Sequence, residues 1–392
     1  MSFELNDEQR QIIQTASKIG EKYGPEYWYE KEENHEFPQE FLDAFAAAGF
    51  IGLGVPEEYG GIGAGLMDQV LAFEAMASSG GGLGPVAACL LGAIFGCSAV
   101  VKLGTEEQKE KYLPDLIGGN KLTCLGLTEP NAGSDTLNIG TFARKEGDEY
   151  VISGQKIFIS LFAEAQQMLL VARTTKKEDA PKKAFGITLF LVDLPNDAIQ
   201  YTSIPKHAVN YFKTYELGID NLRVPKECML GDENMGWYQV LEVLNPERIY
   251  GAVGAVGIGR LAIRKAVEYA NQREVFGKMI ASNQAIQHPF AAAYAKLECA
   301  WLMVLHAADI YDRGGSIKEV GDATTMAKYA AVEAGVEAVH HAMLTLGGYG
   351  FAKEYHIERW WREIQLVRLA PVTQHLTLNY IGQHILGMPK SY

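Results

Sequence analysis

The segment from Leu125 to Asp135 combines residue types that suit the binding of a cofactor. It reads Leu-Gly-Leu-Thr-Glu-Pro-Asn-Ala-Gly-Ser-Asp and is rich in hydroxyl groups and in backbone N–H groups that a turn would expose. We expect Gly133 to allow a positive φ angle in this turn, because glycine adopts such angles without steric penalty. A loop of this kind can hold a phosphate group or the edge of a heteroaromatic ring. Taken alone, the segment fits a binding site and an ordinary irregular loop equally well.

Other patterns of glycine, histidine or serine lack the context that their chemistry would require. The run Gly257-Ile-Gly-Arg-Leu-Ala262 matches a dinucleotide-binding fingerprint, but it lies inside a helical pattern and follows no predicted strand. We interpret its glycines as points of close helix packing. The adjacent His340 and His341 would diverge by about 100° on a helix, which disfavours chelation of one metal ion. Because no HExxH pattern occurs in the sequence, we expect no metal site. No GxSxG nucleophile elbow occurs either.

The composition indicates a folded, acidic protein. The chain has 392 residues, of which 48% are hydrophobic, and its 35 Lys and Arg against 48 Asp and Glu give a formal net charge of −13. This length is typical of two or three domains, and the apolar fraction is too high for a disordered chain. Because an acidic surface repels phosphate polyanions, we expect no nucleic-acid partner. Five scattered cysteines without a CxxC pair argue against a disulfide scaffold and favour a reducing compartment.

The N-terminal residues and one uncharged segment bear on the location of the protein. The sequence begins Met-Ser-Phe-Glu-Leu-Asn-Asp-Glu, which is acidic and polar where a signal peptide is basic and then apolar. Residues 75–101 carry no charge, but only residues 86–101 resemble an apolar helix, and a bilayer span needs about 20 residues. We therefore expect a buried core helix there, no membrane insertion and a cytoplasmic protein.

Periodic hydrophobic patterns divide the chain into a helical, a β-rich and a second helical part. Asn6 and Thr105 each begin a predicted helix with a capping signal. The run from Tyr150 to Ile159 predicts a hairpin whose turn lies at Ser153 and Gly154. Further β-rich runs occupy residues 168–172, 186–192 and 218–224. Wide apolar stripes predict helices over residues 260–273, 286–312 and 323–346.

These patterns together predict an α+β fold. Its parts are an N-terminal helical domain over residues 1–122, a central β-domain over residues 123–232 and a C-terminal four-helix bundle over residues 233–392. No helix-length pattern separates the predicted strands, which favours an antiparallel sheet, as a small barrel or sandwich, over alternating strands and helices.

Motifs downstream of the 125–135 segment resemble those of one known family. Residues 128–135 are similar to the TEPxAGSD signature of the acyl-CoA dehydrogenase family, and residues 154–160 (Gly-Gln-Lys-Ile-Phe-Ile-Ser) are similar to its GxKxWIT strand. Residues 273–287 resemble its RxxFGK…Q block, and residues 346–362 resemble its GGxG…R block. The four motifs occur in the family's order and cover most of the chain, and the family's plan is also α, then β, then α.

The resemblance implies an FAD-dependent oxidoreductase that converts an acyl-CoA thioester to a trans-2-enoyl-CoA. The residues that match the family's flavin-lining positions are Leu125, Leu127, Thr128, Gly133, Ser134, Phe158, Ile159 and Ser160. Those that match positions closing the site are Thr373 and Gln374. Phe158 stands where the family usually has tryptophan, which weakens one expected contact.

The resemblance also implies partners. Residues matching positions that hold the FAD of a neighbouring subunit are Arg273, Phe276, Gln284, Gly347 and Gly348, and Leu344 stands where a glutamine often reaches that FAD. A homo-oligomer follows, expected to be a tetramer built as a dimer of dimers. Electrons are expected to leave through an electron-transferring flavoprotein, in fatty acid metabolism.

The catalytic base is the point at which this chain departs from most of the family. Counting from Arg362, the usual position of the glutamate holds Pro371, which cannot accept a proton and has no backbone N–H. A minority of members carry the base on a helix, immediately before an arginine, and here that place reads Asn245-Pro-Glu247-Arg248. The resemblance therefore implies Glu247 as the base, with Asn245, Arg248 and Ser134 beside the substrate.

The local pattern around Glu247 supports this assignment but also fits a simpler role. Asn245 and Pro246 are typical of an N-cap and the first helical residue, which would put Glu247 in the first turn of a helix. There the helix dipole would lower its pKa, whereas burial against acyl chain and flavin would raise it. A base with a raised pKa suits abstraction of an α-proton. An acidic residue in a first turn is also commonly no more than a partner of the helix dipole.

Two alternatives to the dehydrogenase hypothesis remain open at this point. The proline in the base position allows a family member with altered chemistry, such as elimination of a β-substituent or oxygen-dependent oxidation. The second alternative is a non-catalytic acyl-CoA-binding oligomer that keeps flavin only as a structural element.

Overall fold

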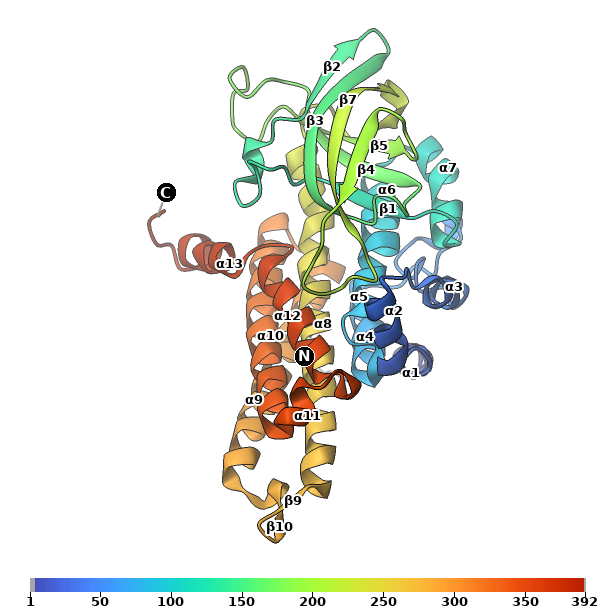
Figure 1. Ribbon diagram of the computed structural model, residues 1–392. Helices are drawn as coiled ribbons and strands as arrows, with labels where there is room; N and C mark the ends of the chain where they lie inside the picture. The colour runs from blue at the N-terminus through green and yellow to red at the C-terminus, as the bar shows by residue number, and fades with distance from the viewer. Residues whose placement is uncertain (1–3, 391–392) are drawn as a thin grey trace. The chain divides into compact units, whose positions relative to one another are not determined.

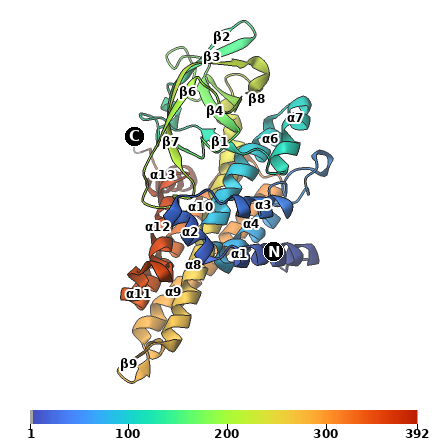
Figure 2. The same ribbon diagram turned by 45° about the vertical axis from the view of Figure 1, so that its right-hand side comes forward.

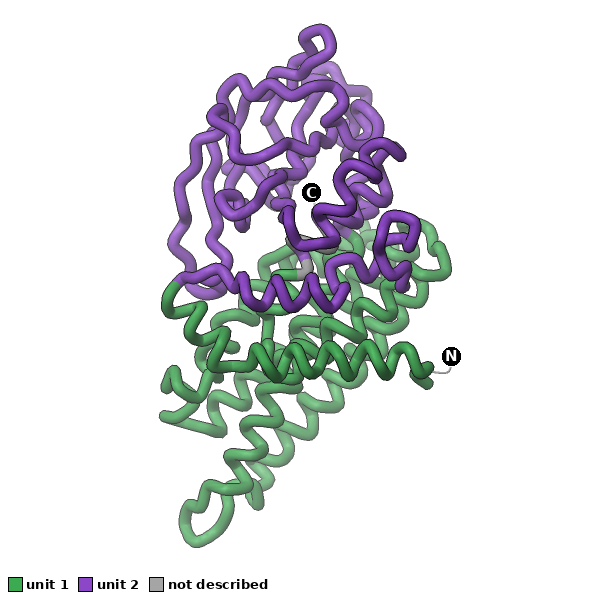
Figure 3. Tube along the Cα trace, turned by 90° about the vertical axis from the view of Figure 1, so that its right-hand side faces the viewer, with its two compact units in different colours: residues 1–34, 65–88, 245–392 green, residues 35–64, 89–244 purple. Residues whose placement is uncertain are grey.

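The chain forms two compact units, which Figure 3 shows in green and purple. The computed structural model describes residues 4–390, except for the side chains of residue 89 and residues 91–94. One unit, here the helical unit, consists of residues 1–34, 65–88 and 245–392, and the other, here the sheet unit, consists of residues 35–64 and 89–244. Each unit therefore combines segments from separate parts of the sequence. The division into three domains near residues 122 and 233 stays a prediction.

The helical unit is built from long helices that bury apolar faces against one another (Figure 1). Its helices are α1 (Asp7–Lys22), α2 (Pro25–Asn34), α4 (Leu66–Met76), most of α5 (Gly84–Cys89), the larger part of α8 (Gly236–Gln272), α9 (Gln284–Asp312), α10 (Ile317–Leu346), α11 (Gly348–Phe351), α12 (Ile357–Leu369) and α13 (Gln374–Tyr380). The α10 helix packs on α9 and α12, and α4 packs on α1 and α9. A two-stranded hairpin, β9 (Glu274–Val275) and β10 (Lys278–Met279), lies at the tip of α8 and α9 in both ribbon views (Figures 1 and 2).

The glycines of the 257–262 segment allow close helix packing, as predicted. A Cβ atom at Gly257 would lie 2.4 Å from the Cβ of Ala77, and one at Gly259 would lie 3.2 Å from the Cα of Gly335 on α10. Real Cβ atoms do not approach other atoms at the first of these distances, so a side chain at Gly257 would push the backbones apart. The segment lies within α8 and follows no strand, so it lacks the geometry of a nucleotide-binding turn.

The sheet unit is built around one eight-stranded sheet with short helices. Its strands are β1 (Thr123–Gly126), β2 (Phe142–Glu146), β3 (Glu149–Ser160), β4 (Gln167–Arg173), β5 (Ile187–Asp193), β6 (Ile199–Ser203), β7 (Thr214–Pro225) and β8 (Met229–Leu230). Its helices include α3 (Gln39–Ala47), α6 (Ala99–Leu103) and α7 (Glu106–Ile117). The strand order is β6-β7-β3-β2-β4-β5-β8, with β1 paired to β4.

The strands differ in burial and in the direction in which they pair. All seven residues of β4 are buried, whereas β7 alternates buried and exposed residues along most of its length. Most neighbours pair antiparallel, as predicted. Phe142 of β2 pairs with Arg173 of β4 in parallel, and β1 pairs with β4 in parallel over its whole length. This parallel pair brings the residues that follow β1 to the middle of the sheet, where the predicted flavin segment begins.

The predicted hairpin at Ser153 and Gly154 is wrong. The β3 strand runs without interruption from Glu149 to Ser160, and its register against β7 shifts between Ile152 and Gly154. Asp220 and Asn221 of β7 stand opposite Ser153 alone, so the extra residue forms a bulge in β7, and pairing continues on both sides of it. The hairpin turn lies earlier, between β2 and β3, where Gly147 has a φ angle of +65°.

The predicted helix start at Asn245 and Pro246 is also wrong. The α8 helix is continuous from Gly236 to Gln272, with Pro246 inside it, so Glu247 lies in the helix interior and not in a first turn. The apolar residues on both sides of the proline keep the helix packed, and tertiary packing outweighs the hydrogen bond that proline cannot donate. The helix-dipole argument for a lowered Glu247 pKa therefore does not hold.

The fold class is confirmed, with N-terminal helices, a central sheet and C-terminal helices. The Asn6 and Thr105 capping boxes both form, with side-chain oxygens accepting from the Gln9 and Gln108 N–H groups. Within residues 4–390, no helix is apolar over a length that would span a membrane.

Candidate active site

In the sheet unit, the predicted flavin segment leaves β1 and turns back beside β3. Leu125 belongs to β1, and Leu127 and Thr128 follow it with half-buried side chains. The N–H of Ile157 donates to the carbonyl of Thr128 at 2.9 Å, which holds β3 against this segment. The structure thus brings together two predicted flavin-lining stretches, residues 125–128 and residues 158–160.

A buried ion pair holds the segment that follows β1 in place. Lys156 Nζ lies 2.8 Å from Glu129 Oε1 and donates to the carbonyl of Leu127 at 3.0 Å. The other contacts of the Glu129 carboxylate are the N–H groups of Gly140 and Thr141, at 2.6 and 3.0 Å. Burial by itself would raise the pKa of Glu129, but the Lys156 charge and these hydrogen bonds hold it below its usual range. Burial lowers the pKa of Lys156 to about 8.

The end of β3 presents an aromatic side chain in a strained backbone conformation. Phe158 has a φ angle of +59° and is 62% exposed, whereas the next residue, Ile159, is buried. The register against β7 shifts at this point, between Lys156 and Ile159. Ser160 Oγ lies 3.3 Å from Thr214 Oγ1 across the two strands. A positive φ angle in a bulky residue is costly and is found most often at functional sites.

The glycine of the 125–135 segment does not adopt the conformation predicted for it. Gly133 is not among the residues with a positive φ angle, and a Cβ atom there would meet no other atom within 4 Å. Gly133 and Ser134 are exposed, just after a tight turn that Glu129 and Ala132 close with two backbone hydrogen bonds of 3.2 and 3.0 Å. That turn supplies the reversal of the chain, so the glycine is not required for it.

In the helical unit, the candidate base Glu247 lies in a dry environment. Its side chain is buried within the α8 interior, with an exposed fraction of 9%. Burial raises the pKa of Glu247 to about 7, although the charges of Arg248 and Lys328 act in the opposite direction. A carboxyl group with this pKa changes its protonation state near neutral pH, which suits a general base.

Two cations lie close to Glu247, and each is held by one neutral partner. Arg248 Nη1 donates to Asn245 Oδ1 at 2.8 Å, one turn back on α8. Lys328, on α10, donates from Nζ to the carbonyl of Val372 at 2.6 Å. Burial lowers the pKa of Arg248, and it lowers that of Lys328 to about 8. The three candidate residues Asn245, Glu247 and Arg248 therefore belong to one cluster, which Lys328 joins.

The chain segment that carries Pro371 begins α13 beside this cluster. Thr373 is the N-cap of α13, and its side-chain oxygen accepts from the N–H of Leu376 at 3.3 Å. Gln374 is the first residue of the helix. The hydrogen bond from Lys328 to Val372 connects this segment to α10. Thr373 and Gln374, which are predicted to close the site, follow directly after it.

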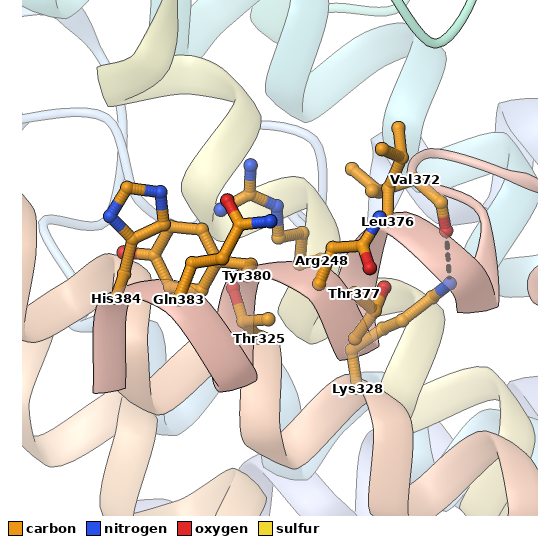
Figure 4. Close-up of a pocket in the computed structure, with 10 residues that line it drawn as sticks. Arg248, Thr325, Lys328, Val372, Leu376, Thr377, Tyr380, Gln383 and His384 are labelled. Atoms are coloured by element: carbon orange, nitrogen blue, oxygen red, sulfur yellow. Dashed lines mark hydrogen bonds between the residues drawn. The ribbon is translucent and has the colours of Figure 1, made fainter. Parts of the chain in front are cut away.

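A cavity of about 200 Å³ lies among α8, α10 and α13 (Figure 4). Ten residues line it, including Arg248, Lys328 and Tyr380. The Tyr380 hydroxyl donates to Asp322 Oδ1 at 2.8 Å, and burial together with this bond raises the pKa of Tyr380 to about 12. Arg248, the residue after the candidate base, thus belongs to the wall of this cavity.

The remaining predicted residues do not join this cluster. They are exposed and comprise Arg273, Phe276, Gln284, Leu344, Gly347 and Gly348. Arg273 directly follows α8, and a helix that rises about 1.5 Å per residue puts it roughly 39 Å from Glu247 along the axis. Phe276 is 100% exposed, with a φ angle of +53°. Within one chain, Arg273 therefore lies far from the Glu247 cluster.

Two functional candidates were missed by sequence reasoning. Lys328 interrupts the apolar face of the predicted 323–346 helix, and a lone buried lysine in such a stripe was a usable signal. Lys156 was part of a quoted motif, but its buried partner, Glu129, lies 27 residues away along the chain. Pairing across that distance depends on the sheet register, which hydrophobic patterns do not specify.

Comparison with protein families identifies the chain. Three family models match consecutive parts of it: the N-terminal domain of acyl-CoA dehydrogenase over residues 6–120, the middle domain over residues 124–222 and the C-terminal domain over residues 234–386. The chain belongs to the acyl-CoA dehydrogenase family. As a member of that family it is an oxidoreductase, and its cofactor is FAD.

Individual relatives of this acyl-CoA dehydrogenase family member match over nearly their full length. Acyl-CoA dehydrogenase FadE12 of Mycobacterium tuberculosis is 36% identical over 389 residues, which are 99% of this chain and 98% of that protein. The 3-(aryl)acrylate reductase of Clostridium sporogenes is 35% identical over 91% of this chain and 93% of its own. The structure of butyryl-CoA dehydrogenase from Megasphaera elsdenii is similar with a TM-score of 0.92 and 30% identity, covering 98% of this chain and 100% of that one.

The residues of the sheet unit fit the flavin of an acyl-CoA dehydrogenase. Half-buried leucines and the exposed Phe158 offer apolar surface to a ring system, and nearby hydroxyl groups can hydrogen-bond to its polar edge. The buried Lys156–Glu129 pair holds this surface in one conformation without occupying it. The chemistry of the donor set therefore agrees with FAD.

Proposed function

We propose that this protein dehydrogenates an acyl-CoA thioester between its α and β carbons, with Glu247 as the base that takes the α-proton. The observation that carries the proposal is the burial of Glu247, which raises its pKa to about 7. A buried carboxyl group of raised pKa is expected of a general base and is costly for a purely structural residue. FAD, when bound, accepts the two electrons that leave with the β-hydrogen.

The cationic neighbours of Glu247 support its role as a base, because they stabilise its ionised form. Arg248 and Lys328 both favour the ionised carboxylate, so the pKa stays near neutrality in spite of burial. Asn245 holds Arg248 at 2.8 Å, which orients the guanidinium without neutralising it. We propose that Asn245, Arg248 and Ser134 contact the acyl-CoA.

The flavin contacts in the proposal fall into two groups. Within one subunit, the flavin-lining residues are Leu125, Leu127, Thr128, Gly133, Ser134, Phe158, Ile159 and Ser160, with Thr373 and Gln374 closing the site. The residues assigned to a neighbouring subunit's FAD are Arg273, Phe276, Gln284, Leu344, Gly347 and Gly348. Their exposure, and the roughly 39 Å along α8 between Arg273 and Glu247, support the binding of the FAD of a second copy of the chain. We therefore propose a homotetramer. We also propose that the protein is located in the cytoplasm.

An electron-transferring flavoprotein is the proposed acceptor of the electrons. A caffeyl-CoA reductase–Etf complex subunit of Acetobacterium woodii is 34% identical over 97% of this chain and is named as part of such a complex. Fatty acid metabolism is the proposed context, because acyl-CoA thioesters are the proposed substrates.

A second candidate function is the reverse reaction, reduction of an α,β double bond. The aryl-acrylate reductase relative supports it, since that protein is named for reduction and matches most of this chain. In this direction Glu247 would donate a proton to the α-carbon, so its raised pKa suits both directions.

An anaerobic mixing experiment tests these functions together. The purified protein with bound flavin is mixed with a panel of acyl-CoAs, the visible flavin absorbance is followed, and the thioester product is identified. Rapid bleaching with formation of a 2-enoyl-CoA is expected. Bleaching that is absent with every acyl-CoA, while the reduced protein hydrogenates enoyl-CoAs, would favour the reductase. Tight acyl-CoA binding without reaction in either direction would favour a non-catalytic binder.

The base assignment has its own test in two matched variants. Glu247→Gln is expected to keep FAD and to lose flavin reduction. Glu268→Gln removes an exposed carboxylate from the same helix and is expected to react at the wild-type rate. Wild-type reduction in Glu247→Gln would show that another group takes the proton.

A further inference from the structure

A buried histidine, His356, lies between the first and the last helices of the helical unit. It is the N-cap of α12, follows the 3₁₀ turn Lys353–Tyr355, and is 3% exposed. Its φ angle of +64° lies in the left-handed region, which few residues other than glycine adopt. The proposed reaction does not involve this residue, so its burial calls for a separate explanation.

The segment that carries His356 contacts α2 through side chains spaced three residues apart. This contact, here the α2–α12 contact, joins parts of the chain that are about 330 residues apart in sequence. Its members are Lys353 Nζ with Glu33 Oε2 at 2.6 Å, His356 Nε2 with Glu26 Oε1 at 3.3 Å, Arg359 Nη2 with the Pro25 carbonyl at 3.2 Å, and Arg362 Nη1 with Glu32 Oε1 at 3.3 Å. Because all four are polar, the strength of the contact depends on the charge of these side chains.

The hydrogen bonds of His356 fit only the neutral form of its ring. The bond to Glu26 assigns the N–H of the neutral imidazole to Nε2, since the carboxylate can only accept. The other ring nitrogen, Nδ1, is buried and has no hydrogen-bond partner within residues 4–390. Protonation would add an N–H at Nδ1, and a buried donor without an acceptor destabilises the closed contact.

The charges that face His356 also disfavour a proton on the ring. Arg359, on the next turn of α12, and Lys265, on α8, both repel a positive charge there. Glu26 attracts it, but 79% of the Glu26 side chain is exposed and solvent screens its charge. Arg359 is fully buried, and its own partner, Glu363, lies 2.8 Å from it.

The remaining groups around His356 add no charge that could favour the protonated ring. The aromatic rings of Tyr29 and Trp360 lie 5.9 and 6.2 Å from the imidazole, between ring centres. Glu33 and Glu358 each pair with a cation of the same contact, Lys353 and Arg362. Burial first, and then the charge of Arg359, lower the pKa of His356 below its usual value.

We propose that the α2–α12 contact is acid-sensitive, and that protonation of His356 opens it. In the open form the ring is solvated and titrates near the usual histidine pKa of about 6.5. The open form therefore binds more protons than the closed form as the pH falls through this value, and acid favours opening. The C-terminal end of α12 leads to the Val372 carbonyl that accepts from Lys328, so the contact anchors the helix that leads into the candidate site.

Hydrogen exchange of the holoprotein tests the proposal without turnover, so the test does not depend on the proposed reaction. Exchange is followed by mass spectrometry at pH 7.5 and pH 5.5, and the rates are corrected for the intrinsic effect of pH on amide exchange. After this correction, peptides from α2 and α12 are expected to exchange at least about threefold faster at pH 5.5. Peptides from the buried strand β4 serve as the reference.

A pair of histidine variants locates the sensor. His356→Asn removes the titrating ring, and asparagine tolerates the left-handed conformation of this position. It is expected to lose the acid-induced increase in exchange. The control, His306→Asn, replaces an exposed histidine of α9 in the same unit and is expected to keep the increase.

Two charge variants test the same idea with His356 in place, so they remain informative if His356→Asn does not fold. Glu26→Gln removes the carboxylate that attracts the proton, and the increase in exchange at pH 5.5 should become larger. Lys265→Gln removes a repelling cation, and the increase should become smaller. Equal corrected rates at both pH values in the wild type, an unchanged increase in His356→Asn, or the opposite order of the two charge variants would overturn the proposal.

Discussion

Lys156 Nζ lies 2.8 Å from Glu129 Oε1, with the lysine side chain fully buried. The pair connects β3 to the segment after β1, because Lys156 also donates to the carbonyl of Leu127 and Glu129 accepts the N–H groups of Gly140 and Thr141. Three chain segments therefore meet at two charged side chains. The predicted flavin-lining surface rests on this connection.

Removal of the lysine should damage both stability and flavin binding. Lys156→Met leaves the Glu129 carboxylate buried without its cation, which typically costs about 3–5 kcal/mol. We expect the free energy of unfolding to fall by that amount and the purified protein to lose most of its FAD. Chemical denaturation and the ratio of flavin to protein absorbance measure the two effects.

The control for this prediction is an exposed ion pair in the same unit. Arg144→Gln breaks the contact between Arg144 and Glu146, whose arginine side chain is 61% exposed. Solvent screens such a pair, so little change in stability or FAD content is expected. Equal FAD retention in Lys156→Met and Arg144→Gln would show that the buried pair does not support the flavin site.

The raised pKa of Glu247 should appear in the pH dependence of stability. Because the folded-state pKa of about 7 lies above the unfolded value of about 4.5, the folded protein binds more protons between these values, and stability falls as pH rises through that window. Glu247→Gln abolishes this effect, since it has no proton to lose. Relative to the wild type, the variant should therefore gain roughly 2–3 kcal/mol between pH 5 and pH 8.

Denaturant unfolding of both proteins at the two pH values measures this difference. A constant gap between wild type and variant across the range would mean that Glu247 titrates alike in the folded and unfolded states. At pH 5 the Glu247 carboxyl is mostly protonated and, like the glutamine, uncharged, so the difference in unfolding free energy at that pH gives the effect of the substitution apart from titration. The change in this difference between pH 5 and pH 8 then gives the effect of ionising Glu247 beside Arg248 and Lys328.

The same pKa should govern the rate of flavin reduction. If the ionised Glu247 takes the proton, kcat/KM should fall about tenfold per pH unit well below pH 7 and level off above it. An exposed carboxylate would titrate near its usual pKa and leave the rate flat from pH 5.5 upward. Stopped-flow reduction with one acyl-CoA across this range separates the two cases, and a flat profile would contradict the buried base.

The helix ends and the family motifs could be predicted from the sequence, because both depend on local patterns. Asn6 and Thr105 form the capping boxes expected of them, since a cap is decided within four residues. The helix start that the sequence predicts at Pro246 does not occur, because Pro246 lies inside α8. Its cap-like neighbour, Asn245, is instead a buried partner of Arg248 within a continuous helix, and tertiary packing settled the outcome.

The family motifs predict which residues belong to the candidate site, and these assignments stay a prediction, but the sequence does not predict the electrostatics of those residues. Motif register indicated Glu247, yet its burial and the approach of Lys328 from α10 depend on how two helices pack. Likewise, Ser153 and Gly154 have a turn composition, but both lie within β3, which pairs with β7 on both sides of a bulge in β7. Contacts made by residues far apart in the chain decided each of these features.

Close packing of α8 on α10 gives a last prediction, on stability. A Cβ atom at Gly335 would lie 2.5 Å from the carbonyl oxygen of Ala255, a backbone atom of α8 that cannot rotate away. Gly335→Ala should therefore destabilise the protein by about 1–3 kcal/mol, although alanine favours helix formation. Gly251→Ala is the matched control, because its Cβ would meet nothing closer than the Cδ of Pro371 at 3.8 Å, an ordinary contact. It should be neutral or stabilising by up to about 1 kcal/mol. Thermal unfolding of the two variants compares them, and equal stability would mean that the helices separate at Gly335 without cost.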